Sequence, residues 1–266
     1  HYQYKFGGTT YNLEFDDDVD PVPGPIADDA FDRLYWTGQT FPRMASSTQI
    51  TTGGSGAYPR SSFRLGVEAP AAAPSAATPT GADDGTQIKY STAYVYTFVT
   101  AFGEEGPPSD PSNVVTKVDG QSIVVTMSST SGSKSDTNYT HKSNTGSNTT
   151  DFQFVTEVTL ATTTFTDSKN NEALGEIIPS TFWIAPPDDN ATLYPNGQMK
   201  GLTAMGNGIF AGFSGKRLCF SEPFLPHAWP VAYRITLEDE SVGISMAGNV
   251  LFIGTKGTNY IASGTD

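Results

Sequence analysis

The sequence has a single cysteine, Cys219, so no disulfide can form within the chain. It has three histidines, His1, His141 and His227, and no Cys/His cluster of the kind that holds structural zinc. No apolar run reaches the roughly 18 residues that a membrane-crossing helix needs, so we expect no membrane segment. Charged residues make up only 16% of the chain, and the net charge is −13. This acidic balance argues against the basic surface of a nucleic-acid-binding protein.

Helical periodicity is also scarce, because apolar residues do not recur at intervals of three and four over several turns. The 27 glycines and 18 prolines are spread through the chain, and aromatic residues reach 12%. Short strands separated by many turns produce this composition. We therefore predict an all-β fold.

A repeat is the most informative pattern that is present. Residues Gly201–Ser221 recur as Gly243–Ser263 at an offset of 42, and a period of about 40–45 residues is typical of β-propeller blades. Arg33–Ser46 aligns with Gly208–Ser221 as a third, degenerate copy. The matching positions include the pairs Gly206/Gly248, Asn207/Asn249, Phe210/Phe252, Gly212/Gly254 and Ser221/Ser263.

The repeat predicts specific local structure. We expect Gly206-Asn207 and Gly248-Asn249 to form equivalent tight turns between antiparallel strands, since Gly and Asn tolerate positive φ. We expect Phe210 and Phe252 both to be buried. These four turn residues are the only structural site that the sequence predicts.

A different pattern interrupts the repeats. Alternating strands are predicted around Tyr90–Ala101, Asn113–Val118, Ser122–Met127, Phe152–Val158 and Thr162–Asp167, with a polar loop over residues 128–150. The predicted organisation is a propeller-like part over residues 1–68, a Pro/Ala-rich linker over 69–79, a β-sandwich over 80–180 and a second, incomplete propeller-like part over 181–266.

Candidates for chemistry are weak. His227, between Pro226 and Trp229, is predicted to pack in a rigid loop, and Cys219 to be a buried structural thiol. The acidic run Asp16–Asp20 offers oxygen ligands for calcium but lacks the spacing of a calcium loop, so a solvated turn is favoured. Glu238 and Glu240 would share a strand face without a marked cleft around them. We expect no catalytic residue, cofactor or metal, and therefore no enzyme.

Two segments carry resemblances. Tyr96–Ser109 resembles the last strands of a fibronectin type III module, and Phe152–Val155 with Thr163–Asp167 resembles its middle strands, in rotated order. Leu218–Pro230 resembles virion structural proteins of tailed bacteriophages. Those proteins couple a propeller-like body to an inserted sandwich. The resemblance thus implies β-propeller-like blades with an inserted fibronectin III-like β-sandwich.

The resemblance implies a structural component of a bacteriophage tail, a nozzle or tail tube in the virion. Its expected partners are copies of itself in a ring, other tail proteins such as the adaptor and fibres, and DNA by non-specific proximity along the exit path. The alternative is a carbohydrate-binding or sugar-cleaving β-propeller tail protein, with Trp36, Trp183 or Trp229 stacking on sugar. A propeller needs about four to eight blades, so we expect the missing blades from further sequence of the same polypeptide rather than from neighbouring subunits.

Overall fold

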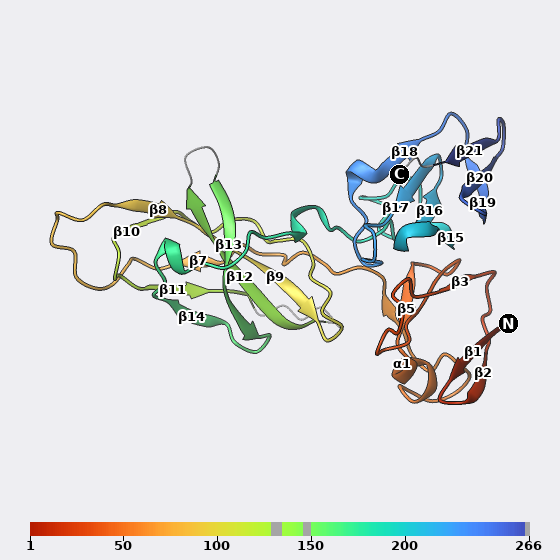
Figure 1. Ribbon diagram of the computed structural model, residues 1–266, viewed down its shortest axis with the longest axis horizontal. Helices are drawn as coiled ribbons and strands as arrows, with labels where there is room; N and C mark the ends of the chain where they lie inside the picture. Colours follow the sequence, from red (N-terminus) through yellow and green to blue (C-terminus); the bar gives the residue numbers. More distant parts are fainter. Residues whose placement is uncertain (129–134, 146–149, 264–266) are drawn as a thin grey trace. The chain divides into compact units, whose positions relative to one another are not determined.

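The computed structural model describes residues 1–128, 135–145 and 150–263. Within these residues the chain is 41% strand and 7% helix, and its strands pair antiparallel in seven small sheets. The predicted all-β class is confirmed. The chain divides into two compact units, one formed by His1–Gly66 with Ile184–Asp266 and the other by Val67–Trp183 (Figure 1).

Three sheets and a hairpin make up the first unit. In each sheet successive strands run up and down beside one another. The first sheet contains β3 (Asp20–Pro23), β4 (Leu34–Thr37), β5 (Arg43–Ala45) and β6 (Phe63–Arg64); the second contains β15 (Lys200–Ala204), β16 (Phe210–Ser214), β17 (Arg217–Phe220) and β18 (Arg234–Thr236); the third contains β19 (Ser241–Ala247), β20 (Val250–Thr255) and β21 (Tyr260–Ser263). The hairpin consists of β1 (Tyr2–Phe6) and β2 (Thr9–Leu13).

One face of the first sheet is covered by the hairpin and by a short helix, α1 (Ser47–Thr51). Ser46 and Gln49 form a capping box at the start of this helix, which satisfies backbone donors there. The buried side chains of this core are Tyr4, Leu13, Leu34, Trp36, Ala45 and Ile50. The helix was not predicted, because one turn is too short to give a periodic apolar pattern.

The three sheets of this unit stack in chain order. The Tyr35 ring on β4 meets the Phe210 ring on β16 edge-on, with centroids 5.3 Å apart. On its opposite face the second sheet packs Ala211 and Phe213 against Leu251 and Ile253 of β20. Because neighbours cover both faces, all five residues of β16 are buried. The third sheet is covered on one face, so burial alternates along much of β20.

The prediction that Phe210 and Phe252 are equivalent buried residues is wrong. Phe210 is fully buried, whereas the Phe252 side chain is 46% exposed. The residue that takes the place of Phe210 in the third sheet is Leu251, which is also fully buried.

The reason lies in the length of the two hairpin turns. The turn between β15 and β16 has three residues, Gly206–Gly208, and is closed by a hydrogen bond from the Met205 N–H to the Ile209 carbonyl. The turn between β19 and β20 has only two residues, Gly248 and Asn249. The structural offset is therefore 42 before the turn and 41 after it: Thr203 pairs with Ala211, and Ser245 pairs with Phe252. A shift of one residue moves every side chain to the other face of a strand. Phe252 is thus the counterpart of Ala211.

The second unit contains two three-stranded sheets and a two-stranded one. Its strands are β7 (Ser75–Ala76), β8 (Tyr90–Thr92), β9 (Tyr94–Thr100), β10 (Val115–Lys117), β11 (Ile123–Thr126), β12 (Ser135–Thr145), β13 (Thr150–Thr159) and β14 (Thr164–Asp167). The sheets have the orders β13-β12-β9, β14-β11-β7 and β10-β8 (Figure 1). β7 lies inside the Pro/Ala-rich stretch. Short 3₁₀ turns occupy Asn171–Ala173 and Ser180–Phe182 in this unit, and Gly206–Gly208 and Val231–Tyr233 in the first unit.

A central strand of this unit was predicted as loop. β12 occupies Ser135–Thr145, within the stretch 128–150 that reads as polar; the rest of that prediction lies partly outside the described residues. Among the side chains of β12 that the structure describes, Thr140, His141, Lys142 and Ser143 are buried. The reading by apolar alternation fails here because this part of the core is polar and is satisfied by hydrogen bonds and an ion pair.

Candidate functional site

The four predicted turn residues lie in the connections between paired strands. Gly206 and Asn207 stand between β15 and β16, and Gly248 and Asn249 between β19 and β20. Asn207 has φ of +60° and Gly248 has φ of +61°, which is the region that Asn and Gly occupy most readily. These residues set strand register, and none of them forms part of a chemical site.

His141, His227 and Cys219 are buried and separate from one another. His227 is 2% exposed, and in the same loop the Trp229 indole donates a hydrogen bond of 2.9 Å to the Pro226 carbonyl. His141 belongs to the other unit, where its Nε2 lies 3.4 Å from Glu105 Oε1. Burial raises the pKa of the Cys219 thiol to about 11, which keeps it protonated and unreactive at neutral pH.

Two of the acidic residues, Asp20 and Glu240, make local contacts. Asp20 accepts hydrogen bonds from Thr37 Oγ1 and from the backbone N–H of Gly201. Glu240 pairs with Lys256, and the segment holding Glu238 and Glu240 is a bend between β18 and β19, not the predicted strand. Across residues 1–128, 135–145 and 150–263, no group of three His, Cys, Asp or Glu side chains could hold a metal ion.

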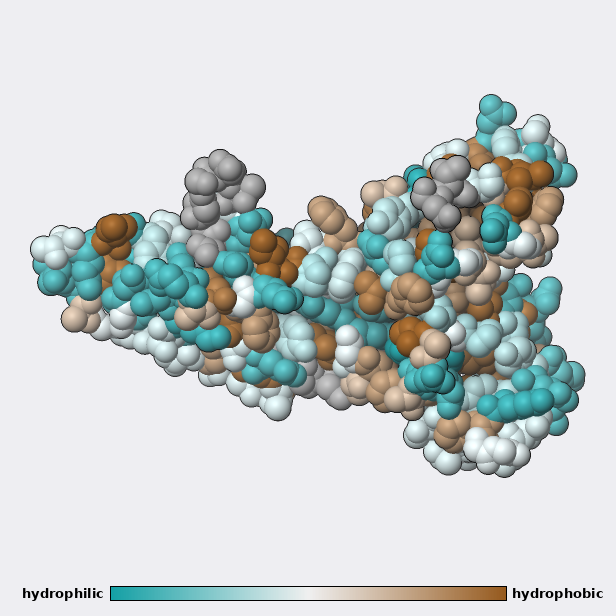
Figure 2. All heavy atoms as spheres, in the orientation of Figure 1, coloured by the Kyte–Doolittle hydropathy of each residue, from teal (hydrophilic) through white to brown (hydrophobic). Residues whose placement is uncertain are grey.

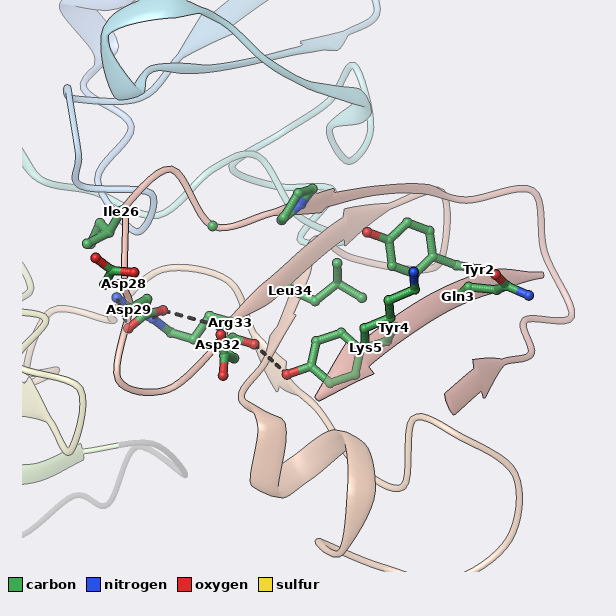
Figure 3. Close-up of a pocket in the computed structure, with 12 residues that line it drawn as sticks. Tyr2, Gln3, Tyr4, Lys5, Ile26, Asp28, Asp29, Asp32, Arg33 and Leu34 are labelled. Carbon is green, nitrogen blue, oxygen red and sulfur yellow. Dashed lines mark hydrogen bonds and ion pairs between the residues drawn. The ribbon is translucent and has the colours of Figure 1, made fainter. Parts of the chain in front are cut away.

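A hollow of about 340 Å³ opens beside the N-terminal hairpin (Figure 3). Arg33 closes one side by a two-point ion pair with Asp29, at 2.7 and 3.3 Å. Burial alone would raise the pKa of Asp29, but the hydrogen bonds from Arg33 outweigh it and lower that pKa. The Tyr4 hydroxyl donates to the Asp32 carbonyl at 2.8 Å. These contacts fix the loop before β4.

The second unit holds a buried ionic cluster that sequence reasoning missed. Lys142 Nζ lies 2.9 Å from Asp167 Oδ2, and both side chains are fully buried. The same oxygen accepts a hydrogen bond of 2.7 Å from the Tyr94 hydroxyl. Lys142 and Lys117 both donate to the carbonyl of Lys169, at 2.7 and 3.3 Å. Asp167 lies on β14 and Lys142 on β12, so the cluster joins the two larger sheets.

The charged groups of this cluster shift one another's pKa values. Burial would raise the pKa of Asp167, but hydrogen bonds from Lys142 and Tyr94 and the lysine charge hold it below its usual value. Burial, and then the charge of Lys142, lower the pKa of Lys117. No sequence signal marked these residues, because the partners are distant along the chain.

The surface most suited to function is the uncovered face of the third sheet, here called the outer face. It carries Val242, Phe252 and Ile261, which are 60%, 46% and 66% exposed. Phe252 and Ile261 are direct cross-strand neighbours. Figure 2 shows apolar surface gathered over β20 and β21. Large exposed apolar residues grouped on one sheet mark an interaction surface more often than a catalytic one.

The repeat shows what such a face does elsewhere in the same unit. By strand pairing, Phe252 corresponds to Ala211 in the second sheet and to Tyr35 in the first. Tyr35 is covered by the second sheet, and Ala211 is covered by the third. Phe252 occupies the same place, yet no described residue covers it to a comparable extent.

Two further observations bear on the class of protein. Among the helices of the described residues, none combines the length and apolar character needed to cross a membrane. No protein-family model matches this chain, and no curated protein matches it.

Proposed function

We propose that this protein is a structural component of a bacteriophage tail, of the nozzle or tail-tube type, and that it assembles as a multi-subunit ring. The observation that carries the proposal is the outer face. The first and second sheets hide their equivalent faces under the next sheet, and the third leaves its own exposed. A stack that ends in bare apolar surface is suited to assembly with further protein.

The stacking also supports the finer description of the fold. Three antiparallel sheets present corresponding faces in the same direction, as blades do in a propeller-like body. The second unit has two main sheets, and its proline-containing segment Gly106–Ser112 is hydrogen-bonded along β9. This arrangement is compatible with a fibronectin III-like sandwich. The segment Leu218–Pro230, which carries the resemblance to tail proteins, runs from β17 into a packed aromatic-proline loop.

The charge of the chain fits a place near DNA without binding to it. A net charge of −13 repels phosphate, so a ring of such chains along an exit path would not retain the genome. Contacts with an adaptor or with fibres, and a location in the virion tail, follow from the same proposal.

The test is to examine virions whose genome encodes the chain. Quantitative mass spectrometry should find the protein at several copies per particle, and electron cryomicroscopy should place it in a ring within the tail. Absence of the protein from purified particles would refute the proposal, and a single copy per particle would refute the ring.

The carbohydrate alternative receives less support from the geometry. Trp36 and Trp229 are 1% and 0% exposed, so neither ring can stack on a sugar without rearrangement. Trp183 is half-buried, and it is the one tryptophan of the three that is not fully buried. Cleavage or retention of a host polysaccharide by the purified protein would nevertheless favour that function.

A further inference from the structure

A second hollow of the first unit lies along the outer edge of β2. Its volume is about 380 Å³, and it opens between this strand and residues 56–58. It is distinct from the hollow of Figure 3, which lies along β1. The residues that line it are Thr9, Thr10, Tyr11, Asn12, Glu14, Gly56, Ala57 and Tyr58.

The fold holds the walls of this hollow in place. The Glu14 backbone N–H donates to the Tyr58 carbonyl at 2.8 Å, and Leu13 and Tyr58 form a β-bridge. The Tyr11 and Tyr58 rings meet edge-on, with centroids 5.1 Å apart, and the Arg60 guanidinium lies 4.3 Å from the Tyr58 centroid. A site whose walls are fixed before binding loses little conformational entropy when a ligand enters.

The lining is polar and carries little charge. Its hydroxyl, amide and carboxyl groups belong to Thr9, Thr10, Tyr11, Tyr58, Asn12 and Glu14. None of these side chains is engaged in a hydrogen bond with another of the described residues, so their donors and acceptors are available to a ligand. Apart from Ala57, the lining has no aliphatic side chain, and it has no cation.

This composition distinguishes between classes of ligand. An extended peptide that adds to a strand edge needs apolar pockets for its alternate side chains, and a phosphate or sulfate group needs cations. The lining offers neither. A sugar presents hydroxyl groups that pair with hydroxyl, amide and carboxylate side chains, and an apolar C–H face that packs against an aromatic ring.

We propose that this hollow binds a neutral oligosaccharide. Tyr11 and Tyr58 supply aromatic surface, and Thr10, Asn12 and Glu14 supply hydrogen bonds to the hydroxyl groups of the sugar. The site does not depend on the proposed tail function, because a structural protein and a free-standing binding protein can both carry it. The composition of virions tests that function, whereas glycan binding tests this site.

The expected affinity is modest. Ligand sites usually enclose about 300–1,000 Å³, so this hollow is at the lower end of the range and holds only part of an oligosaccharide. With few contacts and an open rim, the dissociation constant should be on the order of 0.1–1 mM.

Nuclear magnetic resonance of the isotope-labelled full chain tests the inference. The probes are maltotetraose, cellotetraose, mannotetraose and chitotetraose, each added to about 10 mM, with a sulfated heparin tetrasaccharide and an uncharged tetrapeptide as comparisons. We expect at least one neutral glycan to shift the backbone amides of residues 9–12 and 56–58. The heparin fragment should not shift them, because the lining has no cation.

Two variants and a control locate the binding. Asn12→Ala should weaken it by about tenfold, and Ala57→Trp should abolish it by filling the hollow. Gln3→Ala is the matched control, because Gln3 is the exposed cross-strand neighbour of Asn12 and does not line this hollow. The same spectra show whether each variant is folded.

Several results would overturn the inference. One is the absence of amide shifts at residues 9–12 and 56–58 with all four neutral glycans. Another is glycan binding that folded Ala57→Trp leaves unchanged. Shifts caused by the tetrapeptide and not by the glycans would assign the hollow to a peptide, and equal shifts with the heparin fragment would remove the argument from charge.

Discussion

Replacing Asp167 with asparagine is the most informative perturbation of the second unit. The carboxylate of Asp167 accepts hydrogen bonds from Lys142 Nζ, from the Tyr94 hydroxyl and from the backbone N–H of Lys169, at 2.9, 2.7 and 2.9 Å. The substitution keeps the shape of the side chain and removes its charge. It leaves the ammonium groups of Lys142 and Lys117 close together in a buried site.

The expected cost follows from that burial. Removing one partner of a fully buried ion pair costs about 3–5 kcal/mol, because the remaining charge has lost its solvent and its counter-ion. Domains of this size are stable by only about 5–15 kcal/mol, so the second unit should become marginally stable. The corresponding fall in its melting temperature is on the order of 10–20 °C.

Scanning calorimetry, with hydrogen exchange of peptides from β12 and β14 to assign the transition, measures this effect. The control is the quadruple variant Tyr94→Phe, Lys117→Met, Lys142→Met, Asp167→Leu, which removes the three charges and the hydroxyl together. It should lie within about 1–2 kcal/mol of the parent, since an apolar replacement of buried charged groups is often neutral. A cost below about 1 kcal/mol for Asp167→Asn would refute the reasoning, as would an equally unstable quadruple variant.

The dependence on pH has a definite sign. The pKa of Asp167 is lower in the folded protein than its usual 3.8, so its contribution is present above pH 3.8 and is lost as the pH falls through the folded value. In the variant Asp167→Asn, the free energy of unfolding should therefore lack the part of its decrease at low pH that protonation of Asp167 causes. Lys117 has the opposite effect on stability. Because its pKa is lower in the folded protein than its usual value, keeping Lys117 charged at neutral pH reduces the free energy of unfolding. Lys117→Met should therefore stabilise the unit by about 1 kcal/mol.

Two further predictions concern the first unit. Leu251→Ala should destabilise it by about 2–5 kcal/mol because Leu251 is fully buried, whereas Phe252→Ala should cost less than about 1 kcal/mol; chemical denaturation of both variants checks this, and equal costs would contradict the one-residue shift between the repeats. Cys219 should not react with a thiol reagent at pH 8 in the folded protein, since burial raises its pKa to about 11, and should react rapidly once urea unfolds the chain; fast labelling of native protein would show the thiol to be accessible.

Polar strands mark one limit of what the sequence could predict. Alternation of apolar residues located strands near Tyr94–Thr100 and Ile123–Thr126, because their inward side chains bury against a core. The same rule missed β12, whose buried residues include His141 and Lys142. A buried lysine is tolerated only beside a partner such as Asp167, and that partner becomes adjacent only when the sheets assemble.

The sequence by itself determined the all-β class, because frequent glycines and prolines and short alternating runs leave no room for long helices. It also contained the recurrence of Gly201–Ser221, since matching residue types at a fixed spacing need no structure to be seen. Only the tertiary structure decided which side chains that recurrence buries. One extra residue in the turn at Asn207 shifts the pairing register, so Phe252 faces outward where Phe210 faces inward. The physical reason is that a strand alternates its faces residue by residue, and the face it presents to a neighbour is fixed by pairing across the sheet.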